Sequence, residues 1–227
     1  MSRYNDRAPE HAEYSVTASP SYQLLTAAEL RVHLRLPDFG DANADENAYL
    51  ESLIAAAGNS IEATVRRPIR AQTRELVIGG LPHAGGYKSA WWASGAFWWG
   101  YSNDDNIILD ITPIRAVNTI QYVTDGVVTT IPPADYRVVG TGEHITRRVE
   151  IILAEGASWP CPDYETDVTI SADCGFTQAN LPEDLKHAAR IIAGSFYRFR
   201  EDVVTGTIVA ELPRSAKYLL QQYQRFI

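Results

Sequence analysis

Residues 117–131 read VNTIQYVTDGVVTTI, and this stretch decides how the middle of the chain folds. Asp125-Gly126 separates two short runs that are rich in β-branched residues, 117–123 and 127–131. A two-residue turn between antiparallel strands needs positive φ angles, which glycine adopts without steric cost. The stretch therefore predicts a β-hairpin.

Further runs of the same character lie on both sides of this hairpin. They are short, rich in β-branched and aromatic residues, and separated by Pro and Gly. These runs span residues 76–78, 107–109, 136–139, 149–153 and 168–171. We expect residues 72–176 to form one small antiparallel β domain.

Helical signals precede this domain. Thr26 and Glu29 have the spacing of a capping box, which predicts a helix that stops before Pro37. A longer helix is expected from about Asp45 to Pro68, because apolar residues recur at steps of three and four. Its apolar face consists of Leu50, Leu53, Ile54, Ala57, Ile61 and Val65.

Helical signals return after Asn180. Pro182 suits a first helical turn, and the acidic residues that follow it complement the positive end of the helix dipole. The apolar face of this helix is expected to consist of Leu185, Ala188, Ala189, Ile192, Phe196 and Phe199. A last short helix is predicted from about Pro213 to Arg225.

The order of these signals predicts an α+β fold. A helical bundle built from N- and C-terminal helices, residues 21–71 and 177–227, would carry the small antiparallel β domain as an insertion. Residues 1–20 are polar and are interpreted as an N-terminal arm outside any core.

The charge balance excludes one class of protein. Lys and Arg number 20 against 28 Asp and Glu, which gives a net charge of −8. Domains that neutralise nucleic-acid phosphates over their whole surface usually carry a basic footprint. An acidic protein along which DNA slides without sticking remains compatible with this balance.

Motifs of catalysis and cofactor binding are not found in the sequence. It lacks phosphate-loop, nucleophile-elbow, dinucleotide and zinc-protease motifs, and its histidines are scattered without metal spacing. Cys161 and Cys174 are expected to be buried structural thiols. The loop acids Asp104, Asp105, Asp163, Glu165 and Asp167 lack the spacing of a calcium site and are expected to be solvated. We predict a protein that is not an enzyme and binds no cofactor or metal.

Targeting and membrane signals are not found either. Residues 1–15 contain no apolar run of the kind that a secretory signal peptide needs. No run of about 18 apolar residues predicts a transmembrane helix. The expected location is a reducing cytosol, or a particle assembled there.

The most unusual stretch is residues 83–103, HAGGYKSAWWASGAFWWGYSN, which holds four of the five tryptophans. Large aromatic residues in an irregular loop need a cover, and we favour a contact with a neighbouring subunit or another protein. Packing of the loop on its own β domain and a sugar-stacking platform are the alternatives. The contact residues would be Trp91, Trp92, Phe97, Trp98 and Trp99.

The C-terminal stretch, residues 218–227, carries aromatic and aliphatic residues up to its end. From the residues alone, burial in the helical bundle and insertion into a partner are both open. The residues concerned are Tyr218, Leu219, Leu220, Tyr223, Arg225, Phe226 and Ile227.

Residues 22–226 together resemble the head–tail connector (adaptor) proteins of tailed phages and gene transfer agents. No one motif carries the resemblance, which rests on the order and spacing of several. They begin with LTAAEL at 25–30, HLR at 33–35, LIAAA at 53–57 and RPI at 67–69. The later ones are PPADYRV at 132–138, GASWP at 156–160, VTI at 168–170, LPEDLK at 181–186, FY at 196–197, RE at 200–201 and LLQQY at 219–223.

The resemblance implies a homo-oligomeric ring, typically a dodecamer, in the neck of a virion. Such a ring joins the portal protein to the stopper or tail-completion protein, and DNA passes through its lumen without specific binding. Members of the family are not enzymes, use no cofactor and bind no membrane, and they assemble in the host cytoplasm. Their C-terminal segment commonly docks on the portal. A carbohydrate-binding module that uses the tryptophan-rich loop is the alternative function.

Overall fold

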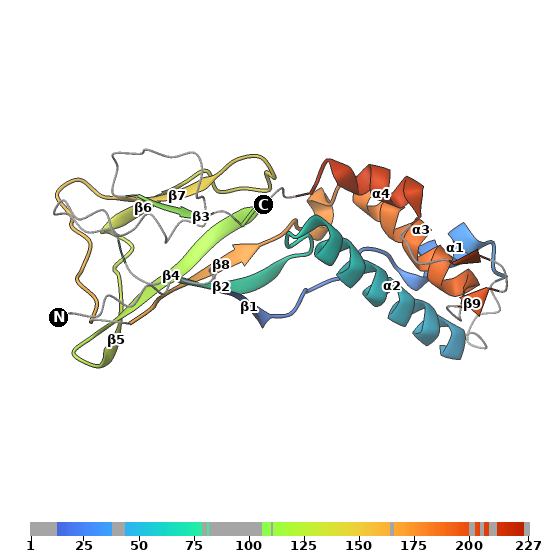
Figure 1. Cartoon of the computed structure of the whole chain (residues 1–227), viewed down its shortest axis with the longest axis horizontal. Helices are drawn as coiled ribbons and strands as arrows, with labels where there is room; N and C mark the ends of the chain where they lie inside the picture. Colours follow the sequence, from blue (N-terminus) through green and yellow to red (C-terminus); the bar gives the residue numbers. More distant parts are fainter. Residues whose placement is uncertain are drawn as a thin grey trace. The chain divides into compact units, whose positions relative to one another are not determined.

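The computed structural model describes residues 13–37, 44–78, 81, 106–109, 111–163, 166–199, 203–204, 207–208 and 213–224. They fall into two compact units. The β unit lies within Met1–Ser19 and Gln72–Gly175, and the helical unit within Pro20–Ala71 and Phe176–Ile227. Figure 1 shows the strands of the first unit and the helices of the second. The predicted α+β class is confirmed.

The β unit contains two antiparallel sheets. The larger has the strand order β1-β2-β8-β4-β5, and the smaller has the order β3-β7-β6. The strands are β1 (Glu13–Ala18), β2 (Gln72–Ile78), β3 (Ile107–Leu109), β4 (Ile114–Thr124), β5 (Val127–Thr130), β6 (Tyr136–Val139), β7 (Val149–Leu153) and β8 (Val168–Cys174).

Alternate residues of the central strand β8 face the core of the β unit. Val168, Ile170, Ala172 and Cys174 are buried, whereas the residues between them are partly exposed. This period of two is the pattern that one buried sheet face imposes on a strand. The same core contains Trp159 and the buried residues of β2, β3, β4 and β7.

The hairpin predicted at Asp125-Gly126 is confirmed. β4 pairs with β5 in antiparallel register, with Thr124 opposite Val127. The two turn residues have φ angles of 52° and 73°. Positive values at both positions match the handedness that the twist of the flanking strands requires.

Strand β1 corrects the prediction that all of residues 1–20 form an arm. β1 pairs with β2, Tyr14 opposite Leu76, and forms an edge of the larger sheet. The side chains of residues 15–19 are exposed, including that of Val16. Because β1 buries no apolar face of its own there, its sequence lacks the alternation by which a strand is identified.

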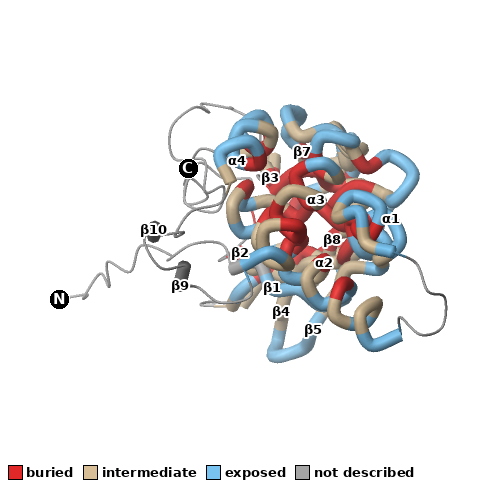
Figure 2. Tube along the Cα trace, turned by 90° about the vertical axis from the view of Figure 1, so that its right-hand side faces the viewer, coloured by how far each residue is buried: buried red, intermediate tan, exposed pale blue. Residues whose placement is uncertain are grey.

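The helical unit contains α1 (Ala27–Leu34), α2 (Ala44–Val65), α3 (Glu183–Arg198) and α4 (Arg214–Gln221), with a 3-10 turn at Gln178–Asn180. α3 contacts the other helices, and α2 also contacts α1 and α4. The capping box is present, since the Thr26 hydroxyl accepts from the Glu29 amide and the Glu29 carboxylate accepts from the Thr26 amide. Figure 2 shows buried residues between α2 and α3 and exposed residues on the outer turns of α1 and α4.

Most residues of the helix faces predicted from apolar spacing are buried, whereas Leu53 and Phe196 are half-buried. Leu50, Ile54 and Ile61 of α2 and Leu185 and Ile192 of α3 are almost wholly buried. Phe199, predicted to continue the face of α3, is instead 46% exposed. The reason is that α3 ends at Arg198, so the next residue leaves the helical path with φ −110° and ψ 74°.

Two smaller expectations about the C-terminal half need correction. The last helix is shorter than predicted, ending at Gln221 with Gln222 as its C-cap. The sequence also did not predict a short pairing of β9 (Val203–Val204) with β10 (Thr207–Ile208). Strands of two residues are too short to show any periodicity.

Candidate assembly surfaces

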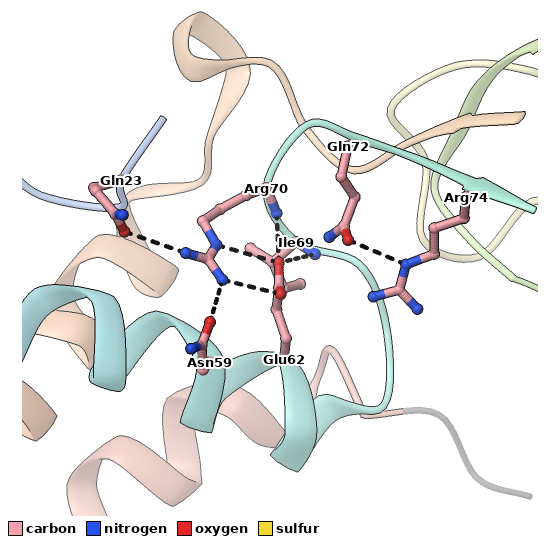
Figure 3. Close-up of polar contacts among 7 residues, drawn as sticks. All are labelled: Gln23, Asn59, Glu62, Ile69, Arg70, Gln72 and Arg74. Atoms are coloured by element: carbon pink, nitrogen blue, oxygen red, sulfur yellow. Dashed lines mark hydrogen bonds and ion pairs between the residues drawn. The ribbon is translucent and has the colours of Figure 1, made fainter. Parts of the chain in front are cut away.

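A buried arginine holds together the segments of the helical unit around the end of α2. Glu62 Oε1 accepts from the backbone amides of Ile69 (3.0 Å) and Arg70 (2.9 Å). Glu62 Oε2 lies 3.1 Å from Arg70 Nη2, and the two side chains are only 13% and 4% exposed. The same guanidinium donates to Asn59 Oδ1 (2.7 Å) and Gln23 Oε1 (3.2 Å), as Figure 3 shows.

A second arginine links three helices of this unit. Arg31 of α1 donates to Glu46 Oε2 (3.1 Å) and to Asn47 Oδ1 (2.7 Å), both on α2, and to the Pro37 carbonyl (2.8 Å). The other oxygen of Glu46 accepts from the Tyr197 hydroxyl of α3 at 3.0 Å. Both arginines are thus held by partners within the chain, and their role is to fix the helices that present the surfaces below.

No pattern in the sequence indicates either arginine. Buried charges are rare, and they are identified by their partners rather than by any local pattern. The partners of Arg31 lie 15 and 16 residues away and Gln23 lies 47 residues from Arg70, so no motif spacing indicates them.

The C-terminal helix divides the predicted docking residues into two groups. Leu220 and Tyr223 are buried in the helical unit, and the neighbouring Gln222 donates to Asp184 Oδ2 of α3 at 2.8 Å. Burial, with a smaller effect of Asp184, raises the pKa of the Tyr223 hydroxyl. Tyr218 is instead 78% exposed, and Leu219 is half-buried.

The remaining predicted contact residues lie outside the described part of the chain. They are Arg225, Phe226 and Ile227 at the C-terminus and Trp91, Trp92, Phe97, Trp98 and Trp99 in the tryptophan-rich stretch.

A hollow of about 250 Å³ opens on the helical unit. Its lining is mainly apolar, with His33 and Arg198 as the ionisable residues, and it comes from α1, from α3 and the residue after it, and from the residue before α4. The lining residues are His33, Leu34, Ile191, Gly194, Ser195, Arg198, Phe199 and Pro213.

The electrostatic environment of this hollow is positive. Partial burial lowers the pKa of His33, and the nearby His187, Arg190 and Arg198 lower it further. A carboxylate of α1, that of Glu29, compensates Arg190 in part at 3.7 Å. An anionic group would be favoured at the rim, since like charges around His33 already disfavour its protonation.

The tip of the β4–β5 hairpin exposes two adjacent valines. Val127 and Val128 are 62% and 64% exposed. Asp163, expected to be solvated, instead fixes the turn: its two carboxylate oxygens accept from the amides of Asp125 (3.0 Å) and Gly126 (2.8 Å). Its own amide donates to the Val123 carbonyl at 2.8 Å.

The two cysteines differ. Cys174 is buried in β8, and burial is the main cause that raises its pKa to about 11. Cys161 is exposed, which corrects the expectation that both thiols are buried. It lies in an irregular segment between Pro160 and Pro162, outside the strands that cover the core.

The described residues offer neither a metal site nor a membrane-spanning helix. No group of three or more His, Cys, Asp or Glu side chains among them is placed to hold a metal ion. No helix among them is long and apolar enough to cross a membrane.

Comparison with known proteins finds similar solved chains in one kind of assembly. No protein-family profile and no curated protein sequence matches the chain. A solved chain from the neck of an empty gene transfer agent particle, computed with C6 symmetry, is 25% identical, with a TM-score of 0.67 over 95% of this chain and 96% of that one. A chain from the virion of the native gene transfer agent particle is 25% identical, with a TM-score of 0.65 over 94% and 96% of the two chains.

A third neighbour supports the fold only. It comes from the neck of the native particle computed with C12 symmetry, at 23% identity and a TM-score of 0.63, over 95% and 96% of the two chains. The likeness therefore extends over nearly the whole length of both chains and covers both units.

Proposed function

We propose that this chain is a structural subunit of the neck of a phage-like particle. The observation that carries the proposal is the 25% identity and TM-score of 0.67 to a neck chain over 95% of this sequence. Likeness over both units, rather than over one module, supports the role of the whole chain. A structural role also accounts for the two buried arginines, whose partners hold helices rather than a reactant.

Within the neck, the proposed role is that of a head–tail connector (adaptor). Copies of the chain would form a ring, a dodecamer in the typical case, between the portal protein and the stopper or tail-completion protein. The C6 symmetry of the neck that contains the 25% identical neighbour supports a ring. DNA would pass through the lumen without specific binding, and the net charge of −8 suits a low-friction passage.

The proposed portal contact is the exposed side of the C-terminal helix. Tyr218 and Leu219 would meet the portal directly, continued by Arg225, Phe226 and Ile227, while Leu220 and Tyr223 would support the helix from inside. Exposed tyrosine is a frequent anchor at protein contacts, because it gives a large contact area at small entropic cost.

Electron microscopy of the purified chain tests the ring. We expect closed rings, alone or after addition of portal. Monomers that are retarded on a polysaccharide gel would contradict the proposal and support a carbohydrate-binding module instead.

Co-sedimentation with portal rings tests the portal contact. Tyr218→Ala should reduce the bound fraction, whereas Glu155→Ala, a change at an exposed residue of the β unit, should leave it unchanged. Equal binding of both variants would contradict docking through this face.

A gel-shift assay with duplex DNA tests whether DNA passes through the ring without being bound. We expect no submicromolar binding at physiological salt. A salt dependence that corresponds to several neutralised phosphates would contradict it.

A further inference from the structure

We propose that the β4–β5 hairpin tip of one copy inserts into the α1/α3 hollow of the next copy in the ring. The hairpin tip is defined as Asp125, Gly126, Val127 and Val128, and the α1/α3 hollow as the eight residues that line it. The proposal rests on the ring proposed above, and it names the contact by which one subunit would hold its neighbour.

The hairpin tip has the properties of an inserted knob. β5 is an edge strand with two valines more than 60% exposed and with no charged residue to protect the edge. Native proteins usually protect or cover such an edge. Asp163 clamps the turn through two amides, so little conformational freedom is lost when the tip is bound.

The α1/α3 hollow has the properties of a matching socket. Its volume of about 250 Å³ is below the ~300–1,000 Å³ of small-molecule sites, and it suits one or two side chains. Leu34, Ile191 and the half-exposed ring of Phe199 offer apolar contact. Apolar side chains of the tip would gain by leaving water there.

Charge complementarity selects the partner. The hairpin tip carries the exposed carboxylate of Asp125, with Asp163 beside it, whereas the guanidinium of Arg198 lines the hollow. A second copy of this chain supplies both the apolar and the acidic part of the knob. Because knob and socket are different surfaces of one chain, their contact is heterologous, and repeated contacts of this kind form a ring when the rotation between neighbouring copies closes.

A cysteine pair tests the contact directly. The variant carries Val128→Cys at the tip and Ser195→Cys in the hollow, in a Cys161→Ser background that removes the exposed native thiol. Oxidation of assembled rings should give a ladder of covalent oligomers on a non-reducing gel. The matched control replaces Val128→Cys by Val16→Cys, which places the thiol on β1, at the opposite edge of the same sheet.

The outcomes separate this proposal from the one on which it rests. Rings that give a ladder only with the tip cysteine support the contact. Rings that give no ladder, or an equal ladder with Val16→Cys, overturn the contact and leave the ring in place. If no rings form with any variant or with the wild-type chain, the ring and the contact both fail.

A charge variant gives a second readout. Asp125→Asn keeps a residue that tolerates the positive φ angle and removes only the charge. We expect ring assembly to require up to about fivefold more protein, the range of one exposed ion pair, with an unchanged melting temperature of the monomer. Assembly of this variant at the wild-type protein concentration would overturn the electrostatic part of the proposal.

Discussion

A Cβ atom on Gly58 would lie 3.1 Å from Nη1 of Arg70 and 3.2 Å from its Cζ. The guanidinium has little room to yield, because Glu62, Asn59 and Gln23 hold it by hydrogen bonds. Glycine inside a helix is unfavourable relative to alanine by roughly 0.5–1 kcal/mol. Close packing against the arginine therefore explains why a glycine lies in the middle of α2.

The contact between Gly58 and Arg70 predicts that two glycine-to-alanine substitutions differ in their effect on the free energy of unfolding. Gly194→Ala in α3 should raise the free energy of unfolding by about 0.5–1 kcal/mol, because its Cβ would meet no described atom closer than 3.5 Å. Gly58→Ala should give no such gain, or a loss, because it displaces Arg70. Urea denaturation of both variants measures the difference, and an equal gain in stability would contradict the packing argument.

The buried ion pair predicts a large effect from removing one partner. Glu62→Ala leaves the Arg70 guanidinium without its carboxylate and two backbone amides without their acceptor. The loss of a partner from a buried pair costs about 3–5 kcal/mol, and we expect the helical unit to unfold at correspondingly lower denaturant. Lys186→Met, which breaks the exposed pair with Glu183, is the control and should leave the midpoint unchanged.

These buried networks mark the limit of what the sequence could predict. Strand and helix positions follow from periodicity and turn residues, as the confirmed hairpin at Asp125-Gly126 and capping box at Thr26 show. The partners of Arg70 and Arg31 are brought together by tertiary folding, which leaves no local pattern. The same holds for the α1/α3 hollow, whose lining comes from three segments that are distant in sequence.

The C-terminal residues show a related limit. Leu220 and Tyr218 are both large and largely apolar. From the sequence, each side chain could either be buried in the helical bundle or insert into a partner protein. Only the packing of α4 on α3 separates them, with 0% exposure for Leu220 and 78% for Tyr218.

The hydrogen bonds from the amides of Asp125 and Gly126 to the Asp163 carboxylate predict that Asp163 stabilises the hairpin. Asp163→Ala removes the acceptor of two backbone amides, and we expect a loss of about 1–2 kcal/mol from the stability of the β unit. Glu155→Ala, a change of an exposed acid in another turn, should have no measurable effect. Thermal unfolding followed by far-ultraviolet circular dichroism compares them, and equal melting temperatures would contradict the clamp.

The two thiols should differ in reactivity. Cys161 is exposed, whereas Cys174 is buried with its pKa raised to about 11, so the reactive thiolate of Cys174 is rare at neutral pH. An aromatic disulfide reagent should therefore modify one thiol per native chain and both after unfolding in denaturant. Cys161→Ser should abolish the native reaction. Rapid reaction of that variant would contradict the burial of Cys174.

Helix α4 is predicted to serve stability and docking through different residues. Leu220→Ala removes a side chain with 0% exposure and should destabilise the helical unit by about 2–5 kcal/mol. Tyr218→Ala removes an exposed ring and should leave the melting temperature nearly unchanged while weakening co-sedimentation with portal.

A truncation after Pro213 should combine both effects, because it uncovers the face of α3 that α4 packs on, and it should leave the β unit folded. Melting curves and portal co-sedimentation of the three variants, measured side by side, decide the matter. If Tyr218→Ala lowers the melting temperature as much as Leu220→Ala does, or if the truncated chain still binds portal with full affinity, the division of roles is wrong.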